Sequence, residues 1–186
     1  KLNIASLDDT MFSDMLFGHR KGAFTSAFSD RKGLIQQAEG GVLFLDEIGE
    51  LERASQVKLL QLIQSGEYYR LGSDQLMHCH TRIIAATNAR LQKKMKDESF
   101  REDLYYRFIY QIHLPPLRER LEDIHLLLPY FIEMAATDLG IKVPQIPQKL
   151  AKLLKTYHFP GNIREFQKLV YEALSHSATG TISLEY

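Results

Sequence analysis

Two adjacent carboxylates, Asp46 and Glu47, follow directly on the apolar run VLFL at residues 42–45. A short apolar run that ends in acids is typical of a buried parallel strand with polar groups at its carboxyl end. There, Asp46 can position Mg²⁺ on a phosphate, usually through water, and Glu47 can orient and deprotonate an attacking water. The alternative is that Asp46 caps the next helix and Glu47 is only solvated, and the spacing alone leaves both interpretations open.

Two arginines, Arg101 and Arg107, lie in the segment SFREDLYYRF, which is predicted to be a helix. A planar, permanently charged guanidinium stabilises the negative charge that spreads over a phosphoryl group during hydrolysis. On one continuous helix the two side chains would point about 240° apart. Either Arg101 therefore lies at the helix start, or one arginine is structural. For Arg107 the alternative is a surface ion pair with Glu102 or Asp103.

The apolar pattern predicts the elements that position these groups. Strands are expected over residues 1–7, 42–47, 82–88 and 110–117, helices over 8–17, 55–66, 91–95, 99–108 and 118–139, and a hairpin over 67–80. Pro129 is expected to kink or divide the last helix. The composition shifts at the linker GIKVPQIP, after which helices are expected over 148–156 and 162–175. We therefore expect an α/β domain over 1–140 and a small helical domain over 141–186.

Charge and composition exclude several classes of protein. The 23 Lys and Arg residues balance the 23 Asp and Glu residues, so no global field favours nucleic acid or an anionic membrane. A single cysteine excludes an internal disulfide framework and fits a reducing compartment. No apolar run approaches the roughly 20 residues that cross a bilayer. These features predict a cytoplasmic protein.

Several motifs carry a family resemblance. GGVLFLDEIGEL, RIIAATN, FREDLYYRF, LPPLRERLEDI and FPGNIREF occur in this order, after a loop that reads LFGHRKGAFTSA. Together they resemble the AAA+ domain of sigma-54-dependent transcription activators, the NtrC-like bacterial enhancer-binding proteins, over nearly the whole chain. The resemblance implies an α/β fold: an AAA+ parallel-sheet nucleotide-binding core, truncated at its N-terminal side, followed by a small helical lid. It also implies an ATPase that uses ATP and Mg²⁺.

The resemblance assigns roles to the residues near the two carboxylates. Asp46 and Glu47 match the Walker B acids, which position magnesium through water and activate the hydrolytic water. Asn88 matches the sensor 1 residue, which responds to the γ-phosphate, and Thr87 lies beside it. Asn3 matches an asparagine that holds the catalytic glutamate in an inactive pose.

The resemblance also assigns roles to three arginines. Arg101 and Arg107 match the arginine fingers, which enter the active site of the neighbouring subunit. Arg164 matches the sensor 2 arginine, which reaches the nucleotide from the lid. The alternative for Arg164 is a surface ion pair with Glu165 or Glu172.

The loop GHRKGAFTSAFSD, residues 18–30, carries two aromatic residues in a polar setting, and it resembles the GAFTGA loop of this family. That loop contacts sigma-54 in the family, so the partner-binding residues implied here are Gly22, Ala23, Phe24, Thr25, Ser26 and Ala27, with Phe24 and Thr25 making the contact. Ser26 stands where the family usually has glycine. A serine at this position would cost roughly 1 kcal/mol if the φ of Ser26 were positive. The alternative for Phe24 is that it packs on its own domain.

The 186 residues contain no Gly-rich loop ending in Gly-Lys-Ser/Thr/Glu. In the family this phosphate loop precedes the strand that KLNIA represents, so we expect the chain alone to bind nucleotide poorly and to be inactive. The resemblance implies a parent protein that forms a homo-oligomeric ring, a hexamer or heptamer. This parent would have an amino-terminal sensory or receiver domain and bind enhancer DNA through a C-terminal domain, and it would act on sigma-54 RNA polymerase holoenzyme. The alternative, favoured only by Ser26, is a sigma-54-independent regulator or scaffold that keeps the AAA+ fold.

Overall fold

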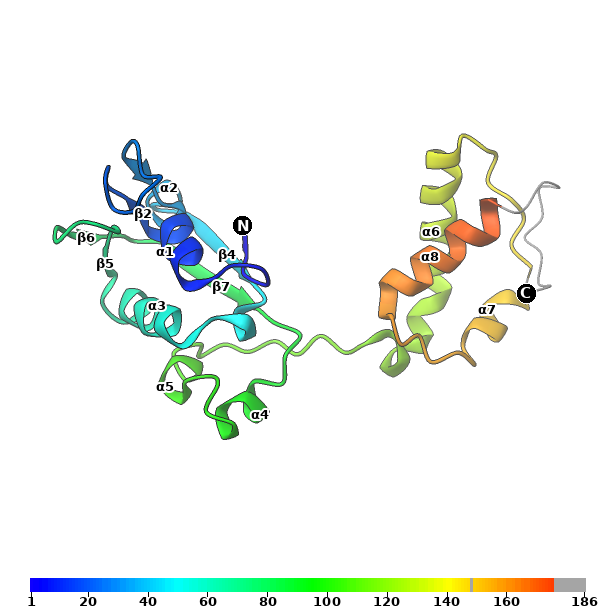
Figure 1. Cartoon of the computed structure of the whole chain (residues 1–186). Coiled ribbons are helices and arrows are strands. Elements are labelled where there is room, and N and C mark those ends of the chain that lie inside the picture. The colour runs from blue at the N-terminus through cyan, green and yellow to red at the C-terminus, as the bar shows by residue number, and fades with distance from the viewer. Residues whose placement is uncertain (148, 176–186) are drawn as a thin grey trace. The chain divides into compact units, whose positions relative to one another are not determined.

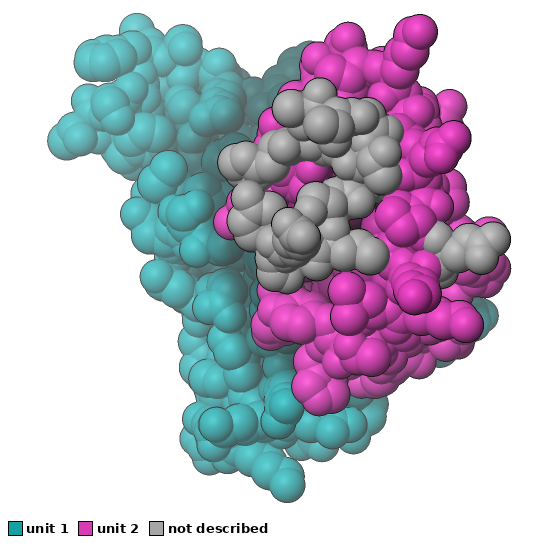
Figure 2. All heavy atoms as spheres, turned by 90° about the vertical axis from the view of Figure 1, so that its right-hand side faces the viewer, with its two compact units in different colours: residues 1–111 teal, residues 112–186 magenta. Residues whose placement is uncertain are grey.

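The computed structural model describes residues 1–147 and 149–175, and the chain forms two compact units (Figure 1). The first unit comprises Lys1–Gln111 and the second begins at Ile112; Figure 2 colours them separately. This division differs from the expected segments 1–140 and 141–186. Residues 112–139 group with the helices that follow them, because the buried apolar side chains between Leu117 and Ala136 share one core with those helices.

A three-stranded parallel sheet lies at the centre of the first unit. Its order is β1 (Leu2–Asn3), β4 (Val42–Asp46) and β7 (Arg82–Ala86), so the predicted parallel α/β architecture is confirmed. The register places Asn3 opposite Asp46 and Asp46 opposite Ala86. The carboxyl ends of all three strands therefore meet at one edge of the sheet.

Helices and two hairpins surround this sheet. The helical elements are α1 (Asp9–Phe17), α2 (Leu34–Gln37), the 3₁₀ turn η1 (Ile48–Glu50), α3 (Arg53–Ser65), α4 (Leu91–Lys96) and α5 (Glu102–Tyr105). The hairpins are β2 (Gly18–His19) with β3 (Arg31–Lys32), and β5 (Glu67–Tyr69) with β6 (Leu76–His78). Asp8 caps α1 by accepting a hydrogen bond from the Met11 amide at 2.7 Å. Gly66 ends α3 in the left-handed region, with φ 72°, as glycine does most easily.

Two elements of the first unit are shorter than expected. The first strand covers only Leu2–Asn3, and the helix predicted over 99–108 is reduced to α5, which is followed by a turn. Arg101 precedes α5 and Arg107 follows it, so the two arginines do not share a continuous helix.

The strand predicted over residues 110–117 is wrong. No residue of this segment pairs with a strand in the part of the chain that the structure describes, and Leu117 begins a 3₁₀ turn instead. The side chains of Tyr110, Ile112 and Leu114 are 91%, 86% and 81% exposed. An alternating apolar pattern becomes a strand only where a neighbouring edge accepts its hydrogen bonds, and here none does.

The second unit is helical. Its elements are the 3₁₀ turns η2 (Leu117–Glu119) and η3 (Leu121–Asp123), then α6 (Ile124–Leu139), α7 (Leu150–Leu154) and α8 (Asn162–Ser175). Pro129 lies inside α6 without dividing it. Phe166 packs edge-to-face against Phe131 and Phe159, with ring centroids 5.7 and 5.4 Å apart, and these aromatics form the centre of the core. The expected helix over 148–156 corresponds to α7, although Gln148 lies outside the described residues.

Candidate nucleotide site and partner loop

Asp46 ends the central strand β4, and its side chain is 26% exposed at the carboxyl edge of the sheet. Its Oδ2 lies 2.8 Å from Nζ of Lys1. Among residues 1–147 and 149–175 there is no group of three metal-ligating side chains. A magnesium ion that keeps several waters needs only one or two carboxylates together with phosphate oxygens, so the partly exposed Asp46 fits such an ion.

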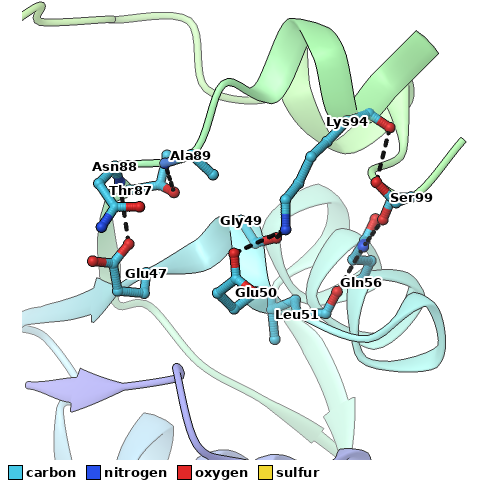
Figure 3. Close-up of polar contacts among 10 residues, drawn as sticks. All are labelled: Glu47, Gly49, Glu50, Leu51, Gln56, Thr87, Asn88, Ala89, Lys94 and Ser99. Atoms are coloured by element: carbon cyan, nitrogen blue, oxygen red, sulfur yellow. Dashed lines mark hydrogen bonds and ion pairs between the residues drawn. The ribbon is translucent and has the colours of Figure 1, made fainter. Parts of the chain in front are cut away.

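Glu47 directs its carboxylate across the sheet edge to the next strand. It adopts a left-handed backbone conformation, with φ 60° and ψ 44°, which is uncommon for a residue other than glycine and typical of functional turns. Its Oε2 accepts a hydrogen bond from the backbone amide of Asn88 at 3.1 Å (Figure 3). The structure therefore brings Glu47 and Asn88 together, while Asn88 itself remains exposed just after β7.

Gly49 holds the turn after the carboxylates close to the end of β7, a role that the sequence did not reveal. A Cβ atom at Gly49 would lie 2.7 Å from Oγ1 of Thr87 and 2.8 Å from Cβ of Ala89. The Thr87 hydroxyl oxygen in turn accepts from the Ala89 amide at 3.0 Å. Lys94 secures the same turn from α4 by donating to the Gly49 carbonyl at 2.7 Å and to Glu50 at 2.8 Å (Figure 3).

Asn3 reaches the same sheet edge but has a different partner from the one expected. Its side-chain oxygen accepts from the Ala5 amide at 3.0 Å. In the part of the chain that the structure describes, Asn3 and Glu47 do not form a hydrogen bond with each other. The register nevertheless places Asn3 directly opposite Asp46.

Gln56 is a buried residue that connects the carboxylate turn with Arg101, and sequence reasoning missed it. Its side chain is fully buried in α3, and Nε2 donates to the carbonyls of Leu51 and Ser99, both at 2.9 Å (Figure 3). Its Oε1 accepts from the backbone amide of Arg101 at 2.8 Å. Both polar atoms of the Gln56 amide thus have hydrogen-bond partners, and this network fixes the backbone at the start of α5.

The two arginines have different surroundings. Arg101 lies just before α5, as one alternative required, and its Nε and Nη2 donate to the Asp103 carboxylate at 2.9 and 2.6 Å. Hydrogen bonds from Arg101 lower the pKa of Asp103 below its usual range. Arg107 is exposed, and Gln64, in the amide orientation that satisfies its hydrogen bonds, accepts from its Nη2 and Nε at 2.8 and 3.3 Å. The ion pair considered for Arg107 with Asp103 is thus made by Arg101 instead.

Arg164 lies in the first turn of α8 and is exposed. Its two candidate partners are engaged elsewhere: Glu165 accepts from the Tyr157 hydroxyl at 2.8 Å, and Glu172 lies 3.4 Å from Lys168. Within the described residues, no ion pair includes Arg164.

The loop between β2 and β3 closes on itself. The Gly22 amide donates to the Ala27 carbonyl at 2.8 Å, and the Ala27 amide donates to the Phe24 carbonyl at 2.9 Å. Positive φ is adopted by Gly22, at 84°, and not by Ser26. Serine therefore fits this turn without the left-handed strain that its replacement of glycine suggested.

The two aromatic residues of this loop differ in exposure. Phe24 is half-buried, and its ring makes an edge contact with His19 at 4.9 Å between centroids. Phe28 is 81% exposed. In this structure Phe24 thus packs on its own domain, the alternative considered for it, and Phe28 faces solvent.

Comparison with known families accounts for both parts of the chain. The family model described as a sigma-54 interaction domain matches residues 1–113, and that of an AAA+ ATPase lid domain matches residues 118–186.

The chain belongs to the sigma-54 interaction domain family.

Relatives of this sigma-54 interaction domain include bacterial regulators. The chain is 44% identical over 187 residues to the anaerobic nitric oxide reductase transcription regulator NorR of Vibrio vulnificus strain YJ016, covering 99% of this chain and 37% of that protein. It is 41% identical over 183 residues to the nitrogen fixation protein VnfA of Azotobacter vinelandii, covering 98% of this chain and 35% of that protein. The chain thus spans little more than a third of the length of these relatives.

Solved structures show the same AAA+ fold. NtrX from Brucella abortus in complex with ADP superposes with a TM-score of 0.85 at 26% identity, covering 98% of this chain and 41% of that chain. NtrX crystallised with ATP gives a TM-score of 0.83 at 28% identity, covering 95% of this chain and 40% of that chain. In the described part of this sigma-54 interaction domain, no helix has the length and apolar character to cross a membrane.

Proposed function

We propose that this domain is the ATP-hydrolysing part of a cytoplasmic sigma-54-dependent transcription activator, which uses ATP turnover to remodel the closed complex of RNA polymerase. The observation that carries the proposal is the convergence of Asp46, Glu47 and Asn88 at one edge of the parallel sheet, with Glu47 bonded to the Asn88 amide. Carboxyl ends of strands in open α/β sheets are where ligands bind.

The residues at this edge divide the chemistry of hydrolysis between them. Magnesium, held through water by Asp46, would neutralise the charge of the phosphates. Glu47 accepts the proton of the attacking water, and the Asn88 amide keeps its carboxylate oriented until the γ-phosphate replaces that contact. Asn88 and Thr87 then lie beside the phosphate, and Asn3 serves as an alternative partner for Glu47.

The arginines complete the site between subunits of a homo-oligomeric ring, a hexamer or heptamer. Arg101 lies before a four-residue helix and Arg107 lies after it, so one exposed segment presents both to a neighbouring subunit. Release of Arg101 from Asp103 would free its guanidinium for the phosphate of that neighbour. Arg164 supplies a further positive charge from the lid unit. Arginine fingers in related chemistry accelerate hydrolysis by about 10³ to 10⁵.

The closed loop of residues 22–27 is the contact with sigma-54 in this proposal. Family membership supports that partner, and the folded geometry supports a preformed contact surface. A phosphate-binding loop is absent from the 186 residues, so this chain by itself is expected to be inactive. In a longer protein of about the length of its relatives, flanking domains would sense the signal and bind enhancer DNA.

A second candidate, a sigma-54-independent regulator or scaffold with the same fold, was suggested only by Ser26. Ser26 is not among the residues with positive φ, so the backbone strain expected of serine at this position does not support this candidate.

The deciding experiment mixes the longer protein with purified sigma-54, ADP and aluminium fluoride and analyses the mixture on a native gel. A slower-migrating complex that depends on aluminium fluoride would support the activator. Normal ATPase activity without such a complex would favour the sigma-54-independent regulator.

A further inference from the structure

Arg107 follows α5, and a side chain of α3 holds its guanidinium. We propose that Gln64 is a positioning residue, which orients Arg107 toward the phosphate bound in the neighbouring subunit. This inference rests on the proposed function, because it names the side chain that prepares one arginine of that intersubunit site.

Gln64 accepts two hydrogen bonds from the same guanidinium. In the amide orientation that satisfies its hydrogen bonds, its side-chain oxygen lies 2.8 Å from Nη2 and 3.3 Å from Nε of Arg107. The two donors lie on one edge of the planar guanidinium and converge on one oxygen. This arrangement restricts rotation of the Arg107 side chain and sets the direction of its plane.

The end of α3 provides a second attraction at the same place. This 13-residue helix has no basic residue in its last turn, and the free carbonyls at a helix C-terminus carry partial negative charge. Arg107 lines a cavity together with Leu62, Ile63 and Gly66, which form this end of α3. Arg107 therefore supplies, from a distant point in the sequence, the positive charge that the last turn of α3 lacks.

Arg107 differs from Arg101 in its partner. Arg101 donates to the Asp103 carboxylate at 2.9 and 2.6 Å, so it has to leave an ion pair before it can bind another anion. Within residues 1–147 and 149–175, no ion pair includes Arg107. Its side-chain partner is the neutral amide of Gln64, and Gln64 therefore determines the direction of the guanidinium.

The backbone that carries Arg107 is anchored independently of Gln64. The Arg107 amide donates to the Leu104 carbonyl at 3.1 Å, and the Phe108 amide donates to the Tyr105 carbonyl at 3.2 Å. Leu104 is fully buried, Phe108 packs against the same core, and α5 packs against α3 (Figure 1). Loss of the Gln64 bonds would thus release the side chain of Arg107 while its backbone stays in place.

The first measurement is ATP turnover by the longer protein that carries this chain and a phosphate-binding loop. We expect Gln64→Leu to lower kcat about 5- to 10-fold with little change in KM, because it removes hydrogen bonds to a charged group that acts in the transition state. Gln61→Leu, at an exposed glutamine one turn earlier on α3, is the matched control and should turn over ATP as the wild type does. An unchanged kcat in Gln64→Leu would overturn the inference.

Mixed rings show in which subunit Gln64 acts. Glu47→Gln subunits have a disabled site and an intact Arg107, whereas Gln64→Leu subunits have the reverse. In randomly mixed rings, purified through a different tag on each variant, about a quarter of the sites combine an intact Glu47 with a correctly held arginine of the neighbour. Turnover should therefore exceed the mean of the two separate proteins about 3- to 5-fold.

The control for this mixture replaces Gln64→Leu with Arg107→Ala, which removes the arginine itself. If Arg107→Ala gains turnover on mixing with Glu47→Gln and Gln64→Leu does not, the inference is overturned. If neither variant gains turnover, the proposed intersubunit site is refuted instead.

Side-chain ¹⁵N relaxation of Arg107 gives a readout that needs no nucleotide. In this chain, the order parameter of the Arg107 Nε–H group should fall in Gln64→Leu and stay at the wild-type value in Gln61→Leu. It should be retained in Gln64→Glu, because that carboxylate still accepts from both donors. Equal order in Gln64→Leu and the wild type would overturn the inference.

Discussion

Gln56 offers the sharpest test of how the first unit is held together. Replacing it with leucine keeps a side chain of similar size but removes the partners of the Leu51 carbonyl, the Ser99 carbonyl and the Arg101 amide. Each buried backbone group left without a partner costs about 1 to 3 kcal/mol. The Ser99 and Arg101 groups are only partly buried, so water recovers some of this cost. We expect Gln56→Leu to lower the free energy of unfolding by about 2 to 4 kcal/mol.

Urea unfolding of the purified chain, followed by circular dichroism, measures this difference. The control is Gln75→Leu, the same substitution at an exposed glutamine, which should change stability by no more than about 0.5 kcal/mol. Amide exchange at Arg101 should accelerate only in the Gln56 variant. Equal stability of Gln56→Leu and Gln75→Leu, or an unchanged Arg101 amide, would show that Gln56 does not hold the start of α5.

Three further predictions concern two sites in the first unit and the exposed segment of residues 110–114, where the second unit begins. Gly49→Ala should destabilise the chain by about 1 to 3 kcal/mol in urea unfolding, because its Cβ would overlap Thr87. Burial alone would raise the pKa of Asp9, but hydrogen bonds from Ser55 and Lys58 of α3 outweigh burial, so the pKa is lowered below its ordinary value of 3.8. The ionised carboxylate therefore stabilises the fold fully above pH 3.8, and this contribution is lost as the pH falls further. The Asp9→Asn variant should lose less stability over the same pH range. Urea unfolding at several pH values measures this change in the free energy of unfolding. The exposed apolar side chains of residues 110–114 should make the isolated chain associate, which would appear as concentration-dependent light scattering. The double substitution Ile112→Lys and Leu114→Lys should suppress this scattering.

Local sequence patterns predicted the sheet edge well. The apolar runs before Asp46 and Asn88 predicted two parallel strands, and their polar ends meet because parallel strands end at a common edge. The second strand, β7, was expected to be buried, but none of its residues is, and Ile84 is 43% exposed. The predicted helices over 8–17 and 55–66 are also confirmed, and their ends depend on residues adjacent in sequence, the cap Asp8 and the terminal Gly66.

Features that depend on distant partners could not be predicted. The alternating pattern at 110–114 resembles a strand, but no neighbouring edge pairs with it among the described residues. Gln56 interrupts an apolar stripe, and only the fold shows that its amide meets Ser99 and Arg101. Likewise, the different exposure of Phe24 and Phe28 follows from the position of His19, which sequence spacing does not give.

We infer that Glu47 activates water at the edge of the sheet. This role is tested most directly by ATP turnover of the longer protein, with its phosphate-binding loop, as wild type, Glu47→Gln and Glu52→Gln, an exposed control five positions away. We expect Glu47→Gln to bind ATP still but to hydrolyse it at least about 100-fold more slowly, while Glu52→Gln matches the wild type. Hydrolysis by Glu47→Gln at the wild-type rate would show that Glu47 does not activate the attacking water.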